Sequence, residues 1–183
     1  NDSMIQIKYM SKTLSDFRNF LKPSTKKVLF SISKALNEIN EIIGKQVFYS
    51  NINMNFNYKN KNEELLIYGY ENEFKQVLLN IINNAKNKIV EKNLPLNKKG
   101  EININIQRCE NCNMIEIIDD AGAIDEKIIN SIFEPYFTTK ENGMGLGLYM
   151  AKIIIEDKMK GTISVRNDKN CVIFTIKLPF KKA

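Results

Sequence analysis

The sequence predicts an α+β sandwich in which helices cover one face of a mixed β-sheet. Residues 74–91 carry apolar side chains at helical spacing along one side, which is typical of a helix packed on a core. Residues 102–106 and 114–118 instead place isoleucines at alternate positions, which is typical of strands with one buried face. A chain of 183 residues with 43% hydrophobic content is long enough to enclose such a core.

The start of the chain predicts a short helix, coiled-coil-like, over residues 1–22. Lys22-Pro23 ends it, because the residue before a proline disfavours the helical conformation. The helix either packs on its own domain or pairs with a second copy. Its apolar residues have the spacing of a bundle seam: Ile7, Met10, Leu14, Phe17 and Leu21.

Four elements are expected next, before the long helix. Residues 28–31 predict a short edge strand. Residues 33–43 predict a helix that ends at Gly44, a residue suited to a helix C-cap. Residues 52–58 alternate apolar side chains with asparagines, as a strand does, and residues 65–68 predict a second short strand.

The remaining elements follow the helix at residues 74–91, which Pro95 stops. Residues 102–106 and 114–118 predict a hairpin that brings Asp119 to a strand end. A helix is expected from Leu148 to about Lys158, followed by a final hairpin of residues 162–167 and 171–179.

Charge and composition exclude several functions. The net charge is +6, but the lysines are scattered, and no recognition helix or basic-aromatic stripe is present, so we expect no nucleic-acid partner. Cys109 and Cys112 have zinc-ligand spacing, yet only Cys171 could join them, and a structural zinc site needs four ligands. We therefore expect a reducing, cytoplasmic setting. No apolar run has the length of a membrane helix, although membrane segments upstream of Asn1 stay open.

A glycine-rich loop precedes the helix that begins near Leu148. Gly143, Gly145 and Gly147 occupy alternate positions, and glycine lets a backbone come close to a ligand. The unpaired amides at a helix start favour a phosphate there. A flexible connection would have the same composition.

Four blocks, in this order, carry a resemblance to a known family. They resemble the N, G1, F and G2 boxes of the catalytic domain of sensor histidine kinases, in the Bergerat-fold ATP-binding superfamily. The resemblance covers roughly residues 70–180 and implies a Bergerat-type sandwich over residues 23–183 that binds ATP and Mg²⁺. The blocks are Asn80-Ile81-Ile82-Asn83-Asn84-Ala85, Asp119-Asp120-Ala121-Gly122-Ala123-Ile124, Ile132-Phe133-Glu134-Pro135-Tyr136-Phe137-Thr138-Thr139-Lys140 and Asn142-Gly143-Met144-Gly145-Leu146-Gly147-Leu148.

Within the resemblance, the N box implies the metal site. Asn84 matches the asparagine whose side-chain oxygen coordinates Mg²⁺, and Lys88 either reaches the phosphates or is a surface lysine. Asn80 stands where ATP-hydrolysing relatives have a glutamate that activates water. An amide cannot act as a general base near neutral pH, so hydrolysis should be slow.

The G1 box implies the adenine site. Asp119 matches the acid that accepts a hydrogen bond from the adenine amine beside Ile124, and Thr175 matches a position that supports this contact. Without the resemblance, Asp119 also fits an exposed turn. The family has glycines where this chain has Ala121 and Ala123. If residue 123 needs a positive φ, its methyl group costs about 1 kcal/mol.

The F and G2 boxes imply a lid over the phosphates. Phe133, Tyr136 and Phe137 match aromatics that anchor the lid, although they also fit an ordinary core. Thr139 lies at the base of the lid, and Lys140 is the candidate for contacting the γ-phosphate. The phosphate-binding loop would comprise Gly143, Gly145, Leu146, Gly147 and Leu148.

The implied function is transfer of the ATP γ-phosphoryl group to a histidine, then to a response regulator receiver domain. The acceptor must lie elsewhere, because this chain contains no histidine. Residues 1–22 would be the end of the dimerisation and phosphotransfer helix of a homodimer. The chain would be a cytoplasmic domain, and the resemblance leaves open whether it belongs to an inner-membrane sensor protein. Alternatives are an anti-sigma-type serine kinase, a slow ATPase, or a degenerate non-enzymatic dimerisation module, which Ala121 and Ala123 favour.

Overall fold

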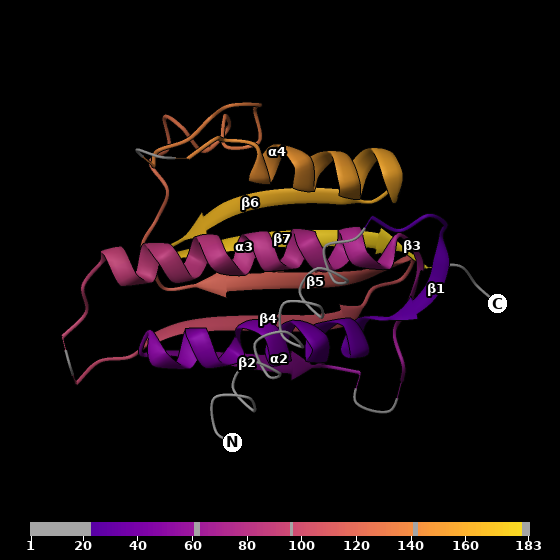
Figure 1. The fold of residues 1–183 in the computed structure, drawn as a ribbon, viewed down its shortest axis with the longest axis horizontal. Coiled ribbons are helices and arrows are strands. Elements are labelled where there is room, and N and C mark those ends of the chain that lie inside the picture. The colour runs from indigo at the N-terminus through magenta and orange to yellow at the C-terminus, as the bar shows by residue number, and fades with distance from the viewer. Residues whose placement is uncertain (1–22, 61–62, 96, 141–142, 181–183) are drawn as a thin grey trace, which may run out of the picture.

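A five-stranded mixed sheet forms the centre of the molecule (Figure 1). The structure is a computed structural model that describes residues 23–60, 63–95, 97–140 and 143–180. Strand order is β2-β4-β5-β7-β6, in which β2 runs parallel to β4 and the other neighbours are antiparallel. The strands are β2 (Ile52–Tyr58), β4 (Gly100–Arg108), β5 (Cys112–Asp119), β6 (Thr162–Asp168) and β7 (Cys171–Pro179).

Helices lie side by side over one face of this sheet, as the sequence predicts (Figure 1). They are α2 (Ile32–Tyr49), α3 (Glu71–Glu91) and α4 (Gly147–Lys152), which continues into a π-helical stretch, η1 (Ile153–Lys158). The core fills the space between the two layers, and the predicted stripe of α3 is buried in it. A separate small sheet pairs β1 (Val28–Ser31) with β3 (Leu66–Gly69) in antiparallel register.

Helix α2 is longer than predicted. It continues through Gly44 to Tyr49, because Val47 extends the buried stripe of Ile39 and Ile43 by another turn. A glycine inside a helix costs only about 1 kcal/mol, which that burial offsets. The chain then ends the helix at Ser50, whose backbone N–H donates to the Gln46 carbonyl.

The predicted helix of residues 1–22 lies outside the described residues, so that helix and the domain boundary after it remain predictions. Among the described residues, no helix is long and apolar enough to cross a membrane.

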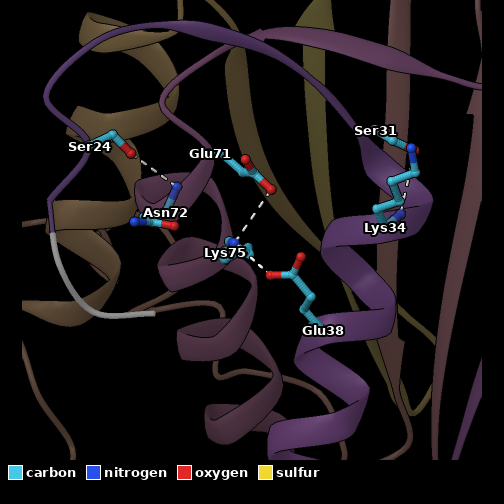
Figure 2. Close-up of polar contacts among 7 residues, drawn as sticks. All are labelled: Ser24, Ser31, Lys34, Glu38, Glu71, Asn72 and Lys75. Carbon is cyan, nitrogen blue, oxygen red and sulfur yellow. Dashed lines mark hydrogen bonds and ion pairs between the residues drawn. The ribbon is translucent and has the colours of Figure 1, made fainter. Parts of the chain in front are cut away.

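An ion-pair cluster around a buried lysine joins α2 to the start of α3 (Figure 2). The ammonium of Lys75, whose side chain is 7% exposed, lies 2.7 Å from the Glu38 carboxylate and 3.5 Å from that of Glu71. Buried charges need such partners, because desolvation disfavours an isolated ion. The cluster therefore fixes the first turn of α3 against α2.

Removing the two carboxylates should cost more than removing the lysine. In Glu38→Gln/Glu71→Gln the buried ammonium loses both of these anions, which should lower the free energy of unfolding by about 2–3 kcal/mol. Lys75→Met leaves two carboxylates that water already reaches, so we expect a smaller loss in the free energy of unfolding. Urea denaturation measures both, and a larger loss in Lys75→Met would contradict this account.

Candidate nucleotide-binding site

One cavity of about 530 Å³ collects nearly all of the predicted site residues. It opens between the second half of α3, the end of β5 and the two loops that the G1 and G2 blocks form. Among the predicted residues, those that line it are Asn80, Asn84, Lys88, Asp119, Ala121, Ala123, Ile124, Phe137, Thr139, Lys140, Gly143, Gly145, Leu146, Gly147 and Leu148.

Strand β5 ends at Asp119 and places this residue in the lining of the cavity. The strand buries alternate residues, so Asp119 follows Ile115 and Ile117 on the face that the helices cover, and it is only 4% exposed. Its Oδ1 accepts a hydrogen bond of 3.1 Å from the Ala121 N–H. Burial raises the pKa of Asp119 to about 6, although the Ala121 hydrogen bond acts in the opposite direction.

Thr175 is the exception among the predicted site residues. In the β5–β7 register Asp119 lies opposite Val172, whereas Thr175 lies opposite Glu116. Because side chains alternate between the faces of a sheet, Thr175 is on the face away from Asp119. The prediction that it supports the Asp119 contact is therefore wrong for this structure. Val172 and Phe174, which sequence reasoning missed, line the cavity from β7.

The backbone strain anticipated at Ala123 does not arise. The left-handed conformation of this loop falls on Gly122, whose φ is +104°, while Ala121 and Ala123 both keep negative φ. An added Cβ at Gly122 would meet no atom within 4 Å, so backbone conformation is what favours glycine there. The two alanines are thus compatible with the fold of this loop.

Helix α3 presents two amides to the cavity. The Asn80 Nδ2 is buried and has no hydrogen-bond partner, which is unusual for a polar atom and suits a ligand that would complete it. The Asn84 Oδ1 accepts a hydrogen bond of 2.9 Å from the Lys140 ammonium. Lys88 lines the cavity too, and its ammonium forms an exposed ion pair of 2.7 Å with Glu91.

Two glycines of the G2 block make close contacts that leave no room for a side chain. Gly145 has a φ of +65°, and a Cβ there would overlap the Tyr136 carbonyl and lie 2.7 Å from the Phe137 nitrogen. A Cβ on Gly147 would lie 2.6 Å from the Asn80 Oδ1. No side chain caps the start of α4 at Gly147, which leaves its first amides for a ligand or water.

The aromatics of the F block differ in their surroundings. Phe137 lines the cavity and packs on the core, and Phe133 packs edge-on against Phe174 at 6.3 Å between ring centroids. Tyr136 is 76% exposed and has a φ of +65°, so its ring is not the ordinary core aromatic that was the alternative to a lid anchor. Its carbonyl instead packs against Gly145.

Comparison with known proteins identifies the family and the fold. The family model of histidine kinase-, DNA gyrase B- and HSP90-like ATPases matches residues 69–182, which include all four blocks. The chain belongs to this ATPase family. A site that holds adenine and phosphates is therefore expected from the family as well as from the cavity.

The relatives of this ATPase domain are sensor histidine kinases. Sporulation kinase A of Bacillus subtilis (strain 168) is 30% identical over 171 residues, which cover 92% of this chain and 27% of that protein. The NtrB histidine kinase/phosphatase of Rhodobacter capsulatus is 43% identical over 65 residues. A solved catalytic domain of histidine kinase ThkA has a TM-score of 0.73 and 27% identity, covering 85% of this chain and 98% of that domain. The chain thus corresponds to the catalytic ATP-binding part of such kinases, and it spans about a quarter of sporulation kinase A.

The cavity residues fit a nucleotide with its metal. The buried Asn80 Nδ2 has no hydrogen-bond partner, so it is a donor that a bound ligand could satisfy, and Gly147 brings the backbone of the glycine loop close to it. The Asn84 Oδ1 already accepts from a cation, the Lys140 ammonium, which stands in for a metal ion there. A neutral oxygen of this kind suits Mg²⁺, which takes much of its shell from phosphate and water.

Asp119→Asn should change stability in a pH-dependent way. Between about pH 4 and 6 the folded Asp119 keeps a proton that the unfolded chain has lost, so its contribution to stability falls as pH rises through this window. At pH 7 the variant should be more stable than the natural chain, by on the order of 2 kcal/mol, and the difference should vanish below pH 4. Denaturant titrations of both proteins at pH 7 and below pH 4 measure the difference in the free energy of unfolding. A difference that does not depend on pH would contradict the burial of a charged Asp119.

Gly147→Ala should impair nucleotide binding more than folding. Its Cβ would force the Asn80 side chain to move, so we expect affinity for a non-hydrolysable ATP analogue to fall about tenfold or more. Gly44→Ala is the matched control, because its Cβ would meet the Asn40 side chain on α2, away from the cavity. Calorimetric titration compares them, and equal affinity in Gly147→Ala and the natural chain would show that the contact does not matter.

Proposed function

We propose that this domain binds Mg²⁺·ATP in the cavity and transfers the γ-phosphoryl group to a histidine outside this chain. A response regulator receiver domain would then accept the group. The kinship with sensor histidine kinases supports this proposal. So does a solved complex of histidine kinase ThkA with the response regulator protein TrrA, which shares the fold.

The observation that carries the proposal is the gathering of three unlike groups around one cavity. Asp119 at one end would accept a hydrogen bond from the adenine amine, between the apolar walls of Ile124 and Val172. Asn84 at the other end would hold Mg²⁺, and the glycine loop would lie along the phosphates. Bound Mg²⁺ would neutralise charge on the phosphates during transfer.

The lining residues favour transfer to a protein over hydrolysis. By the resemblance to the ATP-hydrolysing relatives, Asn80, which lines the cavity, stands where they have a water-activating glutamate, and an amide has no basicity near neutral pH. The described carboxylates that line the cavity are Asp119 and Asp125. Asp119 would be engaged by adenine, and the Asp125 Oδ1 accepts a hydrogen bond of 2.9 Å from the Lys127 N–H. We therefore propose neither carboxylate as the general base for a water beside Asn84.

Lys140 would change partners when the nucleotide binds. The Lys140 ammonium donates a hydrogen bond to the Asn84 Oδ1, which is the oxygen proposed to bind Mg²⁺. The metal ion and the lysine would therefore compete for one acceptor. Two cations so close would also repel each other. Displaced from Asn84, Lys140 would be free to contact the γ-phosphate and stabilise its charge during transfer.

Lys140→Met should therefore affect ADP and ATP differently. Without the competing ammonium, affinity for Mg²⁺·ADP should rise about threefold to tenfold. Affinity for the Mg²⁺ complex of a non-hydrolysable ATP analogue should not rise, because the γ-phosphate contact is lost. Lys152→Met is the control, because this exposed lysine of α4 does not line the cavity, and with EDTA the gain for ADP should disappear. Equal changes for both nucleotides would contradict the exchange of partners.

Phosphoryl transfer itself is tested with labelled ATP and a separate bundle helix that carries the acceptor histidine. We expect acid-labile, base-stable label on the helix, and its loss in Asn84→Ala. Acid-stable label would identify a serine kinase instead, release of phosphate alone a slow ATPase, and absence of nucleotide binding a non-enzymatic module.

The proposal also covers the segment before the catalytic domain, the dimer and the cellular compartment. Residues 1–22 would be the end of the dimerisation and phosphotransfer helix, joined to the catalytic domain at residues 23–183 of a homodimer. The domain would work in the cytoplasm, where ATP and response regulators are found. Sedimentation of a longer chain that includes the preceding helix would test the dimer.

A further inference from the structure

Helix α3 begins without a cap of its own. The residue at its N-cap position, Tyr70, makes no side-chain hydrogen bond to the helix. Helix α2 differs, since its N-cap Ser31 accepts a hydrogen bond of 3.4 Å from the Lys34 N–H (Figure 2). The first amides of a helix lack partners within it, so the start of α3 needs a partner from elsewhere.

Ser24 supplies this partner from a distant part of the sequence (Figure 2). Its Oγ accepts a hydrogen bond of 3.2 Å from the Asn72 N–H. In return, the Ser24 N–H lies 3.3 Å from each carboxylate oxygen of Glu73, a residue only 6% exposed. This exchange resembles a capping box, except that the serine hydroxyl accepts from the amide of Asn72, the residue before the glutamate, and not from the amide of Glu73 itself. Here the serine is 48 residues away from the amide that it caps.

The helix start to which Ser24 binds is itself fixed. Lys75 pairs with Glu71 on the same turn and with Glu38 on α2 (Figure 2). Further along, the same helix carries Asn80 and Asn84 to the cavity. Ser24 therefore joins the chain that enters the domain, directly after Pro23, to the helix that lines the nucleotide site.

We propose that Ser24 is a positioning residue, which anchors the entering chain to α3 and fixes where the preceding segment leaves the ATP-binding domain. A domain that must deliver a phosphoryl group to an acceptor outside it depends on the direction of this connection. Loss of the cap frees the connection at residue 24 while the cavity stays intact. The functional meaning of this inference rests on the proposed transfer to an acceptor outside the domain, whereas the anchoring by Ser24 is tested without any phosphoryl transfer, so the two can fail separately.

The test compares three variants of the chain. Ser24→Ala removes the hydroxyl, Ser24→Thr keeps it, and Ser31→Ala removes the equivalent cap from α2. Amide hydrogen exchange is read at Ser24 and Asn72, and trypsin cleavage is read after Lys26 and Lys27. A fluorophore on the N-terminal amine reports the motion of the preceding segment through its anisotropy decay.

In Ser24→Ala we expect exchange at Ser24 and Asn72 to accelerate about fivefold, the factor that loss of one helix cap predicts. Trypsin cleavage should accelerate and the anisotropy should decay faster, while affinity for an ATP analogue stays unchanged. Ser24→Thr should restore every readout, and Ser31→Ala should alter exchange only in α2. Unchanged exchange and anisotropy in Ser24→Ala would overturn the proposal, and so would the same release in Ser31→Ala.

Discussion

The placement of α3 is the constraint on which the nucleotide site depends. One side of this helix is buried against the sheet through Phe74, Leu78, Ile81 and Ile89, and helical geometry then turns Asn80 and Asn84 toward α4. The buried Lys75 cluster prevents the first turn from shifting relative to α2. Were α3 rotated by one residue, its amides would leave the cavity and its apolar stripe would face water.

The sheet supplies the other half of the site by its register. Asp119 ends β5 on the face that the helices cover, and Val172 lies directly opposite it on β7. The apolar wall excludes water and raises the pKa of the carboxylate, so the unliganded domain holds a charge in an unfavourable environment at neutral pH. In the proposed function, a nucleotide that donates a hydrogen bond there would relieve this cost, which would couple stability to binding.

The sequence predicts those features that repeat with a local period. The apolar stripe of α3 and the alternation of β5 suffice to predict the helix that carries Asn80 and Asn84 and the strand that ends at Asp119. Features that depend on pairing between distant parts of the chain cannot be predicted from such local patterns. Thr175 was misassigned because the face of a residue on β7 depends on its register with β5. The Ser24 cap joins residues 48 apart, and the Lys140 contact with Asn84 joins residues 56 apart, so no local pattern reveals either.

The central claim is that one Mg²⁺-bound nucleotide occupies both ends of the cavity at once. Hydrogen exchange, followed while a non-hydrolysable ATP analogue is titrated with Mg²⁺, tests it most directly. The account predicts that amides at 121–124 and at 143–148 become protected with the same midpoint concentration. Protection of one segment without the other, or two different midpoints, would contradict a single shared site.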